Sequence, residues 1–230
     1  MNSNEILSEI KAIFAAQWNK REGRKVPEAE DVSLGNDAVE LSGTVLYADL
    51  ADSTGLVDNF KAWFAAEAYK AYLVGTCRVI SNNGGEITAF DGDRVMAVFM
   101  GDYKNTSAVR TTLQINYLVR RINAALKKAY PSTAYTLHHT VGIDTSRLFV
   151  ARTGIRKSND LVWVGRAANY AAKLCALGGA DYASYITEAV FSKLNKTAKY
   201  GGSPSRPMWE KRIWKEMGVV VYRSSWWWEF

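Results

Sequence analysis

An Asp-Gly pair between two apolar runs is the feature of this 230-residue sequence that most restricts its fold. Residues 86–90 and 93–99 contain β-branched and aromatic side chains, and Asp91-Gly92 separates the two runs. This dipeptide readily adopts the positive backbone dihedrals that a two-residue turn between antiparallel strands requires. The sequence therefore predicts a β-hairpin whose turn is Asp91-Gly92.

The elements around the hairpin occur in an order that indicates a fold class. The preceding residues predict a strand over 44–50, a helix N-cap at 51–54 and a helix over 55–80. A second long helix is expected over 106–129 and a strand over 136–144. Strand, helix, hairpin, helix, strand is the order of the split βαβ, ferredoxin-like plan. We expect an α+β domain with an antiparallel sheet and flanking helices.

Further elements extend this core at both ends. Apolar residues at helical spacing predict an N-terminal helix over residues 6–18, and a polar connector follows over 20–36. After the core we expect a strand at 160–164, a helix at 166–176 that Gly178-Gly179 ends, a strand and helix over 183–194, and a last strand at 219–222. The chain thus divides into a helix with its connector (1–36), a main domain (37–195) and a C-terminal extension (196–230).

The net charge of +6 is concentrated near the C-terminus of the chain. Between residues 193 and 223 there are eight Lys or Arg and two Asp or Glu, which account for the whole excess. A basic segment beside Trp226-Trp227-Trp228 could contact RNA or a membrane surface. The alternative, which we favour, is a solvated face with the tryptophans packed onto the domain.

Several classes of protein are excluded by the sequence. It has no apolar run long enough to span a bilayer, and its N-terminus lacks the pattern of a signal peptide. Cys77, Cys175, His138 and His139 cannot build a Cys/His zinc site, and the two widely spaced cysteines are typical of a reducing cytoplasm. The motifs of phosphate loops, dinucleotide folds, zinc proteases and serine hydrolases are also absent. We expect a cytoplasmic protein.

Two carboxylates stand where this fold brings strand ends together. Asp49 closes the apolar strand at 44–50, and Asp93 follows the hairpin turn. The first strand lies beside the hairpin in the split βαβ plan, so both side chains are expected at one edge. Paired carboxylates hold two divalent cations about 3.5–4 Å apart in sites for displacement at phosphorus. The alternative is structural, with Asp52 capping a helix and Asp91 and Asp93 building the turn, but the cost of desolvating Asp49 favours the metal site.

Four sequence motifs, which occur in a fixed order along the chain, together resemble those of a known enzyme family. They are Tyr47-Ala48-Asp49-Leu50-Ala51-Asp52-Ser53-Thr54, residues 90–99, Val141-Gly142-Ile143-Asp144-Thr145-Ser146 and residues 165–174. Together they resemble the metal-binding strand, hairpin, central strand and transition-state segment of class III nucleotidyl cyclases. The resemblance covers roughly residues 41–190. The first motif and the aromatic cluster at 226–230 look most like the pyrimidine cyclases of bacterial antiphage (Pycsar) signalling.

The resemblance implies roles for the matched residues. Asp49 and Asp93 would ligate two Mg²⁺ or Mn²⁺ ions, with the backbone carbonyl of Leu50 as a further ligand. One ion would lower the pKa of the ribose 3′-hydroxyl for attack on the α-phosphate, and the other would neutralise the departing pyrophosphate. Asn169 would orient the ribose, and Lys173, one helical turn later, would meet the charge that develops on the α-phosphate. Related cyclases usually have arginine at the second position, so this chain keeps the charge but loses the bidentate fork.

The expected base pocket departs from that of purine-reading cyclases. Those proteins use a lysine three residues before the hairpin glycine and a polar residue seven before the asparagine, where this chain has Ala89 and Val162. Tyr47 projects to the same face as Asp49 and would narrow the pocket. Arg94 carries only donors, which suit the two carbonyls of uracil better than the amino group of cytosine. The resemblance therefore implies UTP as substrate, with CTP, or binding of phosphate by Arg94, as the alternatives.

The resemblance also implies partners. A symmetric homodimer would form composite sites, with Asp49 and Asp93 from one chain and Asn169 and Lys173 from the other. The product, 3′,5′-cyclic UMP, would signal to a separate, membrane-associated effector during phage infection. We expect no nucleic-acid partner and no direct insertion into a membrane.

Two functions from other classes stay open. A catalytically silent cyclase-like domain would only bind nucleotide or dimerise, and Asn169 and Lys173 would then be part of a solvated helix face. Nucleic-acid binding through the basic aromatic tail would be steeply salt-dependent. The two aspartates and Asn169 favour catalysis. A diguanylate cyclase shares the general plan, but Gly84-Gly85-Glu86 lacks the metal-binding aspartate expected there.

Overall fold

The structure is a computed structural model that describes residues 2–178 and 181–230. The helices are α1 (Ser3–Ala15), α2 (Ser53–Asn59), α3 (Ala62–Asn82), α4 (Lys104–Ala129), α5 (Arg166–Cys175), α6 (Glu188–Phe191), α7 (Lys196–Lys199) and a 3₁₀ turn at Ala29–Asp31. The strands are β1 (Asn19–Glu22), β2 (Asp37–Ala51), β3 (Gly85–Asp91), β4 (Arg94–Phe99), β5 (His138–Ile155), β6 (Ser158–Val164), β7 (Ser184–Thr187), β8 (Tyr200–Gly201), β9 (Arg206–Pro207), β10 (Glu210–Trp214) and β11 (Val219–Ser224).

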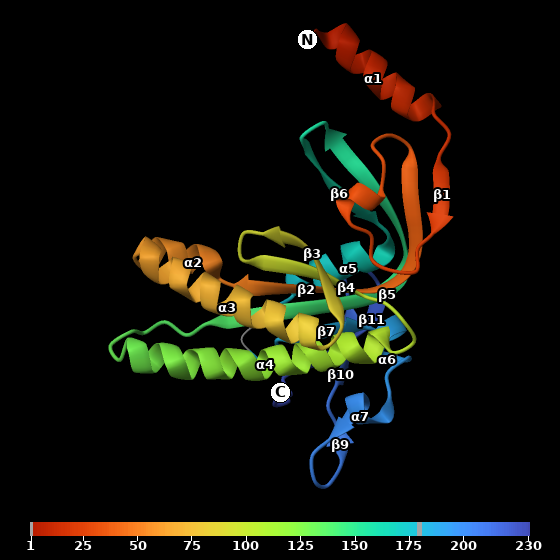
Figure 1. Cartoon of the computed structure of the whole chain (residues 1–230). Helices are drawn as coiled ribbons and strands as arrows, with labels where there is room; N and C mark the ends of the chain where they lie inside the picture. The colour runs from red at the N-terminus through yellow and green to blue at the C-terminus, as the bar shows by residue number, and fades with distance from the viewer. Residues whose placement is uncertain (1, 179–180) are drawn as a thin grey trace.

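One sheet forms the centre of the molecule (Figure 1). Its order is β10-β11-β7-β5-β2-β4-β3, with β1 added to β2 and β6 added to β5. The β5–β7 and β1–β2 pairs are parallel, and the others are antiparallel. The expected order occurs as β2, α2 with α3, the β3–β4 hairpin, α4 and β5. The α+β class and the split βαβ core are therefore confirmed.

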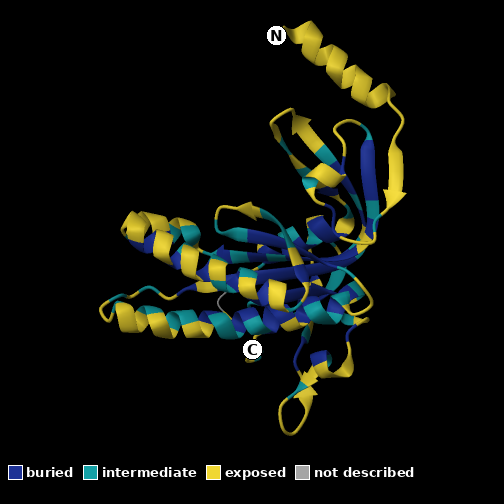
Figure 2. Ribbon diagram, in the orientation of Figure 1, coloured by how far each residue is buried: buried dark blue, intermediate teal, exposed yellow. Residues whose placement is uncertain are grey.

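Helices cover the two faces of this sheet unequally. Side chains alternate along β2, so Leu46 and Ala48 pack with α3 and α4, whereas Val45 packs with α5 on the opposite face. Tyr47 and Asp49 share the parity of Val45 and therefore lie on the α5 side. In Figure 1, α3 and α4 run side by side across the sheet, and in Figure 2 the dark-blue buried residues lie between them and the strands.

The prediction of one continuous helix over 55–80 is wrong, because the structure has two helices there, α2 and α3. Asp52 caps α2 as expected, with its Oδ1 accepting a hydrogen bond from the Gly55 backbone N–H. Phe60 then adopts an extended backbone, with φ −127° and ψ 162°, and α3 begins after it. This break places the Phe60 ring 5.1 Å from Phe64 and 5.3 Å from Tyr135, measured between centroids. The chain thus leaves the helical conformation at Phe60, where the ring of Phe60 packs against Phe64 and Tyr135.

Three other expectations need correction. The polar connector at 20–36 contains most of β1, which pairs with β2 from Asn19↔Asp37 to Glu22↔Glu40. The hairpin turn is Gly92-Asp93 rather than Asp91-Gly92, because Asp91 pairs with Arg94 and Gly92 takes the positive φ of 62°. Strand β10 was not expected, since its exposed polar residues do not form an apolar run. The expected helix stop at Gly178-Gly179 falls partly outside the described residues, and α5 ends at Cys175.

The two ends of the chain differ in how they are attached. An N-terminal helix is confirmed, but α1 begins at Ser3 and ends at Ala15 rather than spanning 6–18. All its residues are exposed, and it projects from the end of the molecule that holds β1 and β6 (Figures 1 and 2). The C-terminal tail lies against α4, where the Trp228 backbone N–H donates to the Leu113 carbonyl and the Asn116 side chain donates to the Trp226 carbonyl. None of the described helices is both long and apolar enough to cross a bilayer.

Candidate active site

The end of β2 brings Asp49 to the β3–β4 hairpin. Ala48 pairs with Val95 of β4, so Asp49 stands beside the next residue of that strand, Arg94. Burial raises the pKa of Asp49 above its ordinary value. The positive charge of Arg94 opposes this shift in the pKa of Asp49, whereas the carboxylate of Asp93 adds to it, so both side chains lie close enough to act on Asp49.

Asp93 has an unmatched acceptor in the turn. Among the described residues, its Oδ2 is buried without a hydrogen-bond partner, and Arg94 Nε is likewise buried without one. A buried polar atom in this state costs roughly 1–3 kcal/mol, and more when charged, unless a ligand satisfies it. Two converging carboxylates, one with a free buried oxygen, are the donor set that hard divalent cations prefer. The site therefore fits the expected cations.

The protein ligands at this site are few. No group of three or more His, Cys, Asp and Glu side chains that could hold a metal ion occurs in the described part of the chain. Further donors would have to be backbone carbonyls, such as that of Leu50, or oxygens of a bound phosphate. A cation there would be held incompletely by the protein alone, which suits a site that binds metal together with its substrate.

Three of the expected base-site residues lie around Asp49 and Asp93. The Arg94 guanidinium is 5.9 Å from the Tyr47 ring centroid, and its Nη2 is 3.4 Å from Asp91 Oδ2. Burial raises the pKa of the Tyr47 hydroxyl. Ala89, beyond an irregularity in the β3–β4 register, packs against the same apolar cluster as Tyr47. The structure thus brings these residues to the hairpin end of the sheet.

The other expected residues do not join them within one chain. Val162 lies on β6 opposite Ala151, which pairs with Ala38 of β2. Ala38 is eleven positions from Asp49, a separation of up to about 35 Å along an extended strand. Asn169 and Lys173 are exposed on α5. Within the described residues, no hydrogen bond or ion pair joins either side chain to the aspartates, and Lys173 Nζ lies 3.8 Å from the sulfur of Met217.

An ion pair between a buried carboxylate and a half-exposed arginine holds the start of α5, and sequence reasoning missed it. Asp144 of β5 is fully buried; Arg166 Nε donates to its Oδ2 at 3.0 Å, and the Thr187 hydroxyl donates to its Oδ1 at 2.5 Å. At the other end of α5, Gly142 allows close approach, because a Cβ there would lie 2.2 Å from the Ala171 carbonyl oxygen. The sequence signal for this ion pair was Asp144, a lone acidic residue in an apolar strand, which indicates a buried charge that needs a partner. These contacts fix the helix that carries Asn169.

The two histidines that begin β5 point to opposite faces, as expected. His139 is buried, with Nε2 2.9 Å from Asn116 Oδ1, and His138 is exposed. Burial lowers the pKa of His139 to about 3, and the positive charge of a protonated His138 acts in the same direction. These are the contacts of a packed side chain.

We expect the free energy of unfolding to fall as the pH drops from about 6.5 towards 3. The unfolded chain protonates His139 near pH 6.5 and the folded chain only near pH 3, so stability present above the unfolded pKa is lost on acidification, by up to about 1.4 kcal/mol per pH unit. His139→Gln keeps a donor for Asn116 without titrating and should reduce the slope. Urea unfolding across this pH range measures it. His138→Gln is the control, and an equal slope in both variants would contradict the assignment.

Comparison with known proteins identifies the family. No protein-family model matches the sequence. A uridylate cyclase of Xanthomonas perforans is 49% identical over 219 residues, which cover 94% of this chain and 93% of the relative. A uridylate cyclase of Rhodovulum sp. (strain MB263) is 40% identical over 98% of this chain and 96% of the relative. The chain belongs to the uridylate cyclase family. It is an enzyme, a nucleotidyl cyclase.

Solved structures show the fold of this cyclase. The guanylyl cyclase Cya2 has a TM-score of 0.69 at 18% identity, and the match covers 83% of this chain and 94% of that protein. The adenylyl cyclase CyaB from P. aeruginosa has a TM-score of 0.66 at 20% identity, over 81% and 95% of the two chains. The cyclase therefore has the fold of a class III catalytic domain.

Proposed function

We propose that this cyclase converts UTP to 3′,5′-cyclic UMP and pyrophosphate. The observation that carries the proposal is the pair of carboxylates, Asp49 and Asp93, at the hairpin end of the sheet, where one buried carboxylate oxygen has no partner among the residues that the structure describes. The relatives named uridylate cyclase, which match nearly the whole chain, support UTP as the nucleotide. The reaction needs a site for divalent cations and a triphosphate, and this end of the sheet suits both.

Asp49 and Asp93 would hold two cations, Mg²⁺ or Mn²⁺, with the Leu50 carbonyl as a further ligand. When bound, the cations would supply the positive charge that acidifies the 3′-hydroxyl and neutralises the triphosphate. The chain itself must keep both carboxylates ionised. The guanidinium of Arg94 favours this by opposing the upward shift that burial imposes on the pKa of Asp49.

The reaction is an internal displacement at the α-phosphorus. Ribose O3′ forms a bond to that phosphorus while the bond from phosphorus to the bridging oxygen of the β-phosphate breaks. The hydroxyl proton passes to solvent, and the electron pair of the broken bond leaves with pyrophosphate. We assign Asn169 to orient the ribose and Lys173 to stabilise the charge on the α-phosphate. Because both are exposed on α5, the proposal takes them from a second copy in a homodimer.

The base would lie against Tyr47 and Ala89 of one chain and Val162 of the other. Neither Ala89 nor Val162 offers a side-chain hydrogen bond, so the purine contacts of related cyclases are not available. Arg94 lies over the Tyr47 ring and can donate to the carbonyls of uracil. CTP is the second candidate, because a pocket of this size would also admit cytosine.

Shortening Tyr47 should enlarge the base pocket. We expect Tyr47→Ala to lower the ratio of kcat/KM for UTP to that for ATP by about tenfold, about 1.4 kcal/mol of discrimination, with a smaller loss for UTP itself. Tyr47→Phe keeps the ring under Arg94 and should retain the preference. Steady-state assays with both nucleotides measure the ratio. An unchanged ratio in Tyr47→Ala would show that this ring does not line the base site.

Product analysis separates catalysis from the silent alternative. The purified protein, incubated with UTP and Mn²⁺, should release cyclic UMP and pyrophosphate in equal amounts, both measured by mass spectrometry. A domain that only binds nucleotide would retain UTP unchanged. We further propose that cyclic UMP acts on a separate, membrane-associated effector during phage infection. We also predict that the protein produces cyclic UMP in the cytoplasm.

A further inference from the structure

Helix α1 presents an apolar stripe to solvent. Its large apolar side chains recur at helical spacing, and each is more than two-fifths exposed: Ile6, Leu7, Ile10, Ile13 and Phe14. Phe14 is 84% exposed. An isolated helix of 13 residues is marginal in water, so a stripe of this kind normally needs a surface to cover it.

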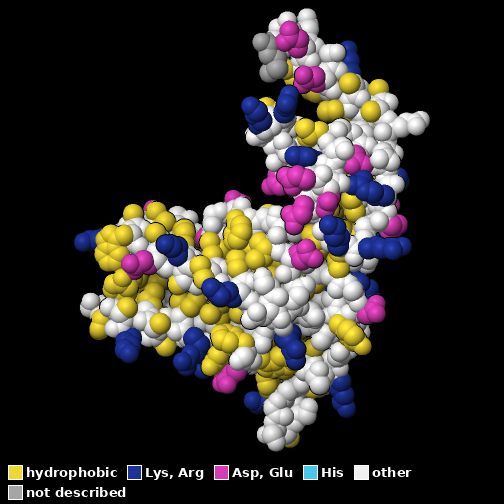
Figure 3. All heavy atoms as spheres, in the orientation of Figure 1, with side chains coloured by type: hydrophobic (Ala, Val, Ile, Leu, Met, Phe, Trp, Pro, Cys, Tyr) yellow, Lys and Arg dark blue, Asp and Glu magenta, His cyan; other side chains and the backbone are white. Residues whose placement is uncertain are grey.

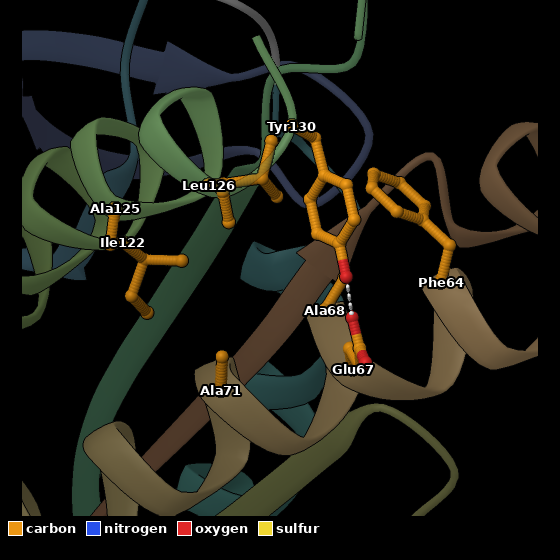
Figure 4. A pocket seen from close by; sticks show the side chains of 9 residues that line it. Phe64, Glu67, Ala68, Ala71, Ile122, Ala125, Leu126 and Tyr130 are labelled. Carbon is orange, nitrogen blue, oxygen red and sulfur yellow. Dashed lines mark hydrogen bonds between the residues drawn. The ribbon is translucent and has the colours of Figure 1, made fainter.

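The same chain carries an open apolar groove between α3 and α4. Phe64, Ala68 and Ala71 of α3 face Ile122, Ala125 and Leu126 of α4 around a cavity of about 240 Å³ (Figure 4). Tyr130 closes one end of the groove and donates a hydrogen bond to Glu67. Exposed Trp63, whose ring centroid lies 6.0 Å from that of Tyr130, continues the apolar surface beside it. Figure 3 shows hydrophobic side chains gathered over this end of the molecule.

Within one chain the stripe and the groove do not meet. Figure 1 places α1 at the end of the molecule with β1 and β6, and places the groove end of α3 and α4 on the opposite side. The C-terminal end of α1 is tethered, because the Asn36 side chain donates to the carbonyls of Ile13 at 2.9 Å and Ala16 at 2.8 Å. Strand β1 then fixes the following residues to β2. Neither apolar surface is therefore covered by the other within one chain.

Charge indicates which partner suits the groove. Its rims carry exposed basic side chains one position from a lining residue, Lys70, Arg121 and Lys128, and the acidic lining residue Glu67 accepts the hydrogen bond of Tyr130. The polar side of α1 carries Glu5 and Glu9 against a single Lys11. An acidic amphipathic helix thus matches a basic-rimmed apolar groove. The same charge argues against a membrane surface, because helices that lie on membranes are rich in Lys and Arg.

We propose that α1 of one copy of this chain lies in the α3–α4 groove of a second copy. An amphipathic helix in a groove between two helices is a common mode of recognition, read through residues at i, i+3, i+4 and i+7. A two-fold dimer makes the contact reciprocal, so both stripes and both grooves are covered at once. The contact involves no residue assigned to the reaction. It can therefore be tested independently of the proposed substrate.

Disulfide trapping tests this contact without any nucleotide. In a Cys77→Ala background, the double variant Ile10→Cys with Ala125→Cys should form a two-chain disulfide product under mild oxidation. We expect at least ten times the yield given by Ser8→Cys with Ala125→Cys, because Ser8 lies on the polar side of α1. Ile10→Cys alone should give none above background. A second pair, Ile6→Cys with Ala71→Cys, repeats the test, and thermal melting confirms that each variant is folded.

Three results would overturn the proposal. A disulfide within one chain would show that α1 folds onto its own groove. A two-chain product from Ile10→Cys alone would show that the α1 helices pair with each other. Yields no higher than the Ser8 control in both pairs would show that α1 does not enter the groove at all.

Discussion

Asp93→Asn should lower turnover of UTP by about a thousandfold or more, while the melting temperature should not fall. An amide keeps the shape of the side chain but lacks the charge that binds a divalent cation. A loss of about 4 kcal/mol of transition-state stabilisation corresponds to roughly this factor. Because Asp93 Oδ2 is buried without a partner among the described residues, removing the charge relieves a cost to the folded state. The same result is expected for Asp49→Asn.

The hairpin supplies a matched control for this experiment. Asp91 lies two residues before Asp93, and its side chain is 83% exposed, so Asp91→Asn should change turnover by no more than a few-fold. Initial rates with Mn²⁺, together with thermal melting of the metal-free proteins, give both readouts. Turnover near the wild-type rate in Asp93→Asn or Asp49→Asn would reject the metal assignment.

Mixing two inactive variants should restore activity if the site is shared between chains. Asp93→Asn and Asn169→Ala homodimers should each be inactive. In a heterodimer formed by subunit exchange, one site carries both lesions and the other carries neither. With equal amounts and random pairing, half of the dimers are heterodimers with one intact site each, so activity should recover to about a quarter of the wild-type value.

The mixing ratio gives this experiment its internal control. Activity should rise and fall with the product of the two subunit fractions, and should be greatest at equal amounts. Exchange can be followed independently with differently tagged subunits. If heterodimers form and no activity returns at any ratio, the site is built within one chain and the assignment of Asn169 to a partner fails.

Local sequence patterns predicted the parts of the fold that depend on local interactions. The strand at 44–50 and the hairpin, combined with the split βαβ order of elements, placed Asp49 and Asp93 at one end of the sheet, although the turn was predicted one residue too early. The break at Phe60 was missed because it depends on the ring of Tyr135, which is 75 residues away in the chain. The helix propensities of residues 55–80 carry no information about that contact.

Interactions between distant segments set the remaining features. The pairing of β1 with β2 and the ion pair of Asp144 with Arg166 depend on where separate segments meet. The relation between Asp49 and Asn169 is also beyond a single sequence, because the proposed site takes the two residues from different chains. A resemblance to cyclases indicated that arrangement, and only an experiment on the assembled protein tests it.

The most direct test of the proposed function is competition among nucleotides in one reaction. The protein is incubated with Mn²⁺ and equal concentrations of ATP, GTP, CTP and UTP, and the cyclic products are separated and identified by mass. We predict 3′,5′-cyclic UMP as the main product, with cyclic CMP in smaller amount. Cyclic AMP or cyclic GMP as the main product would contradict the account of a pyrimidine cyclase.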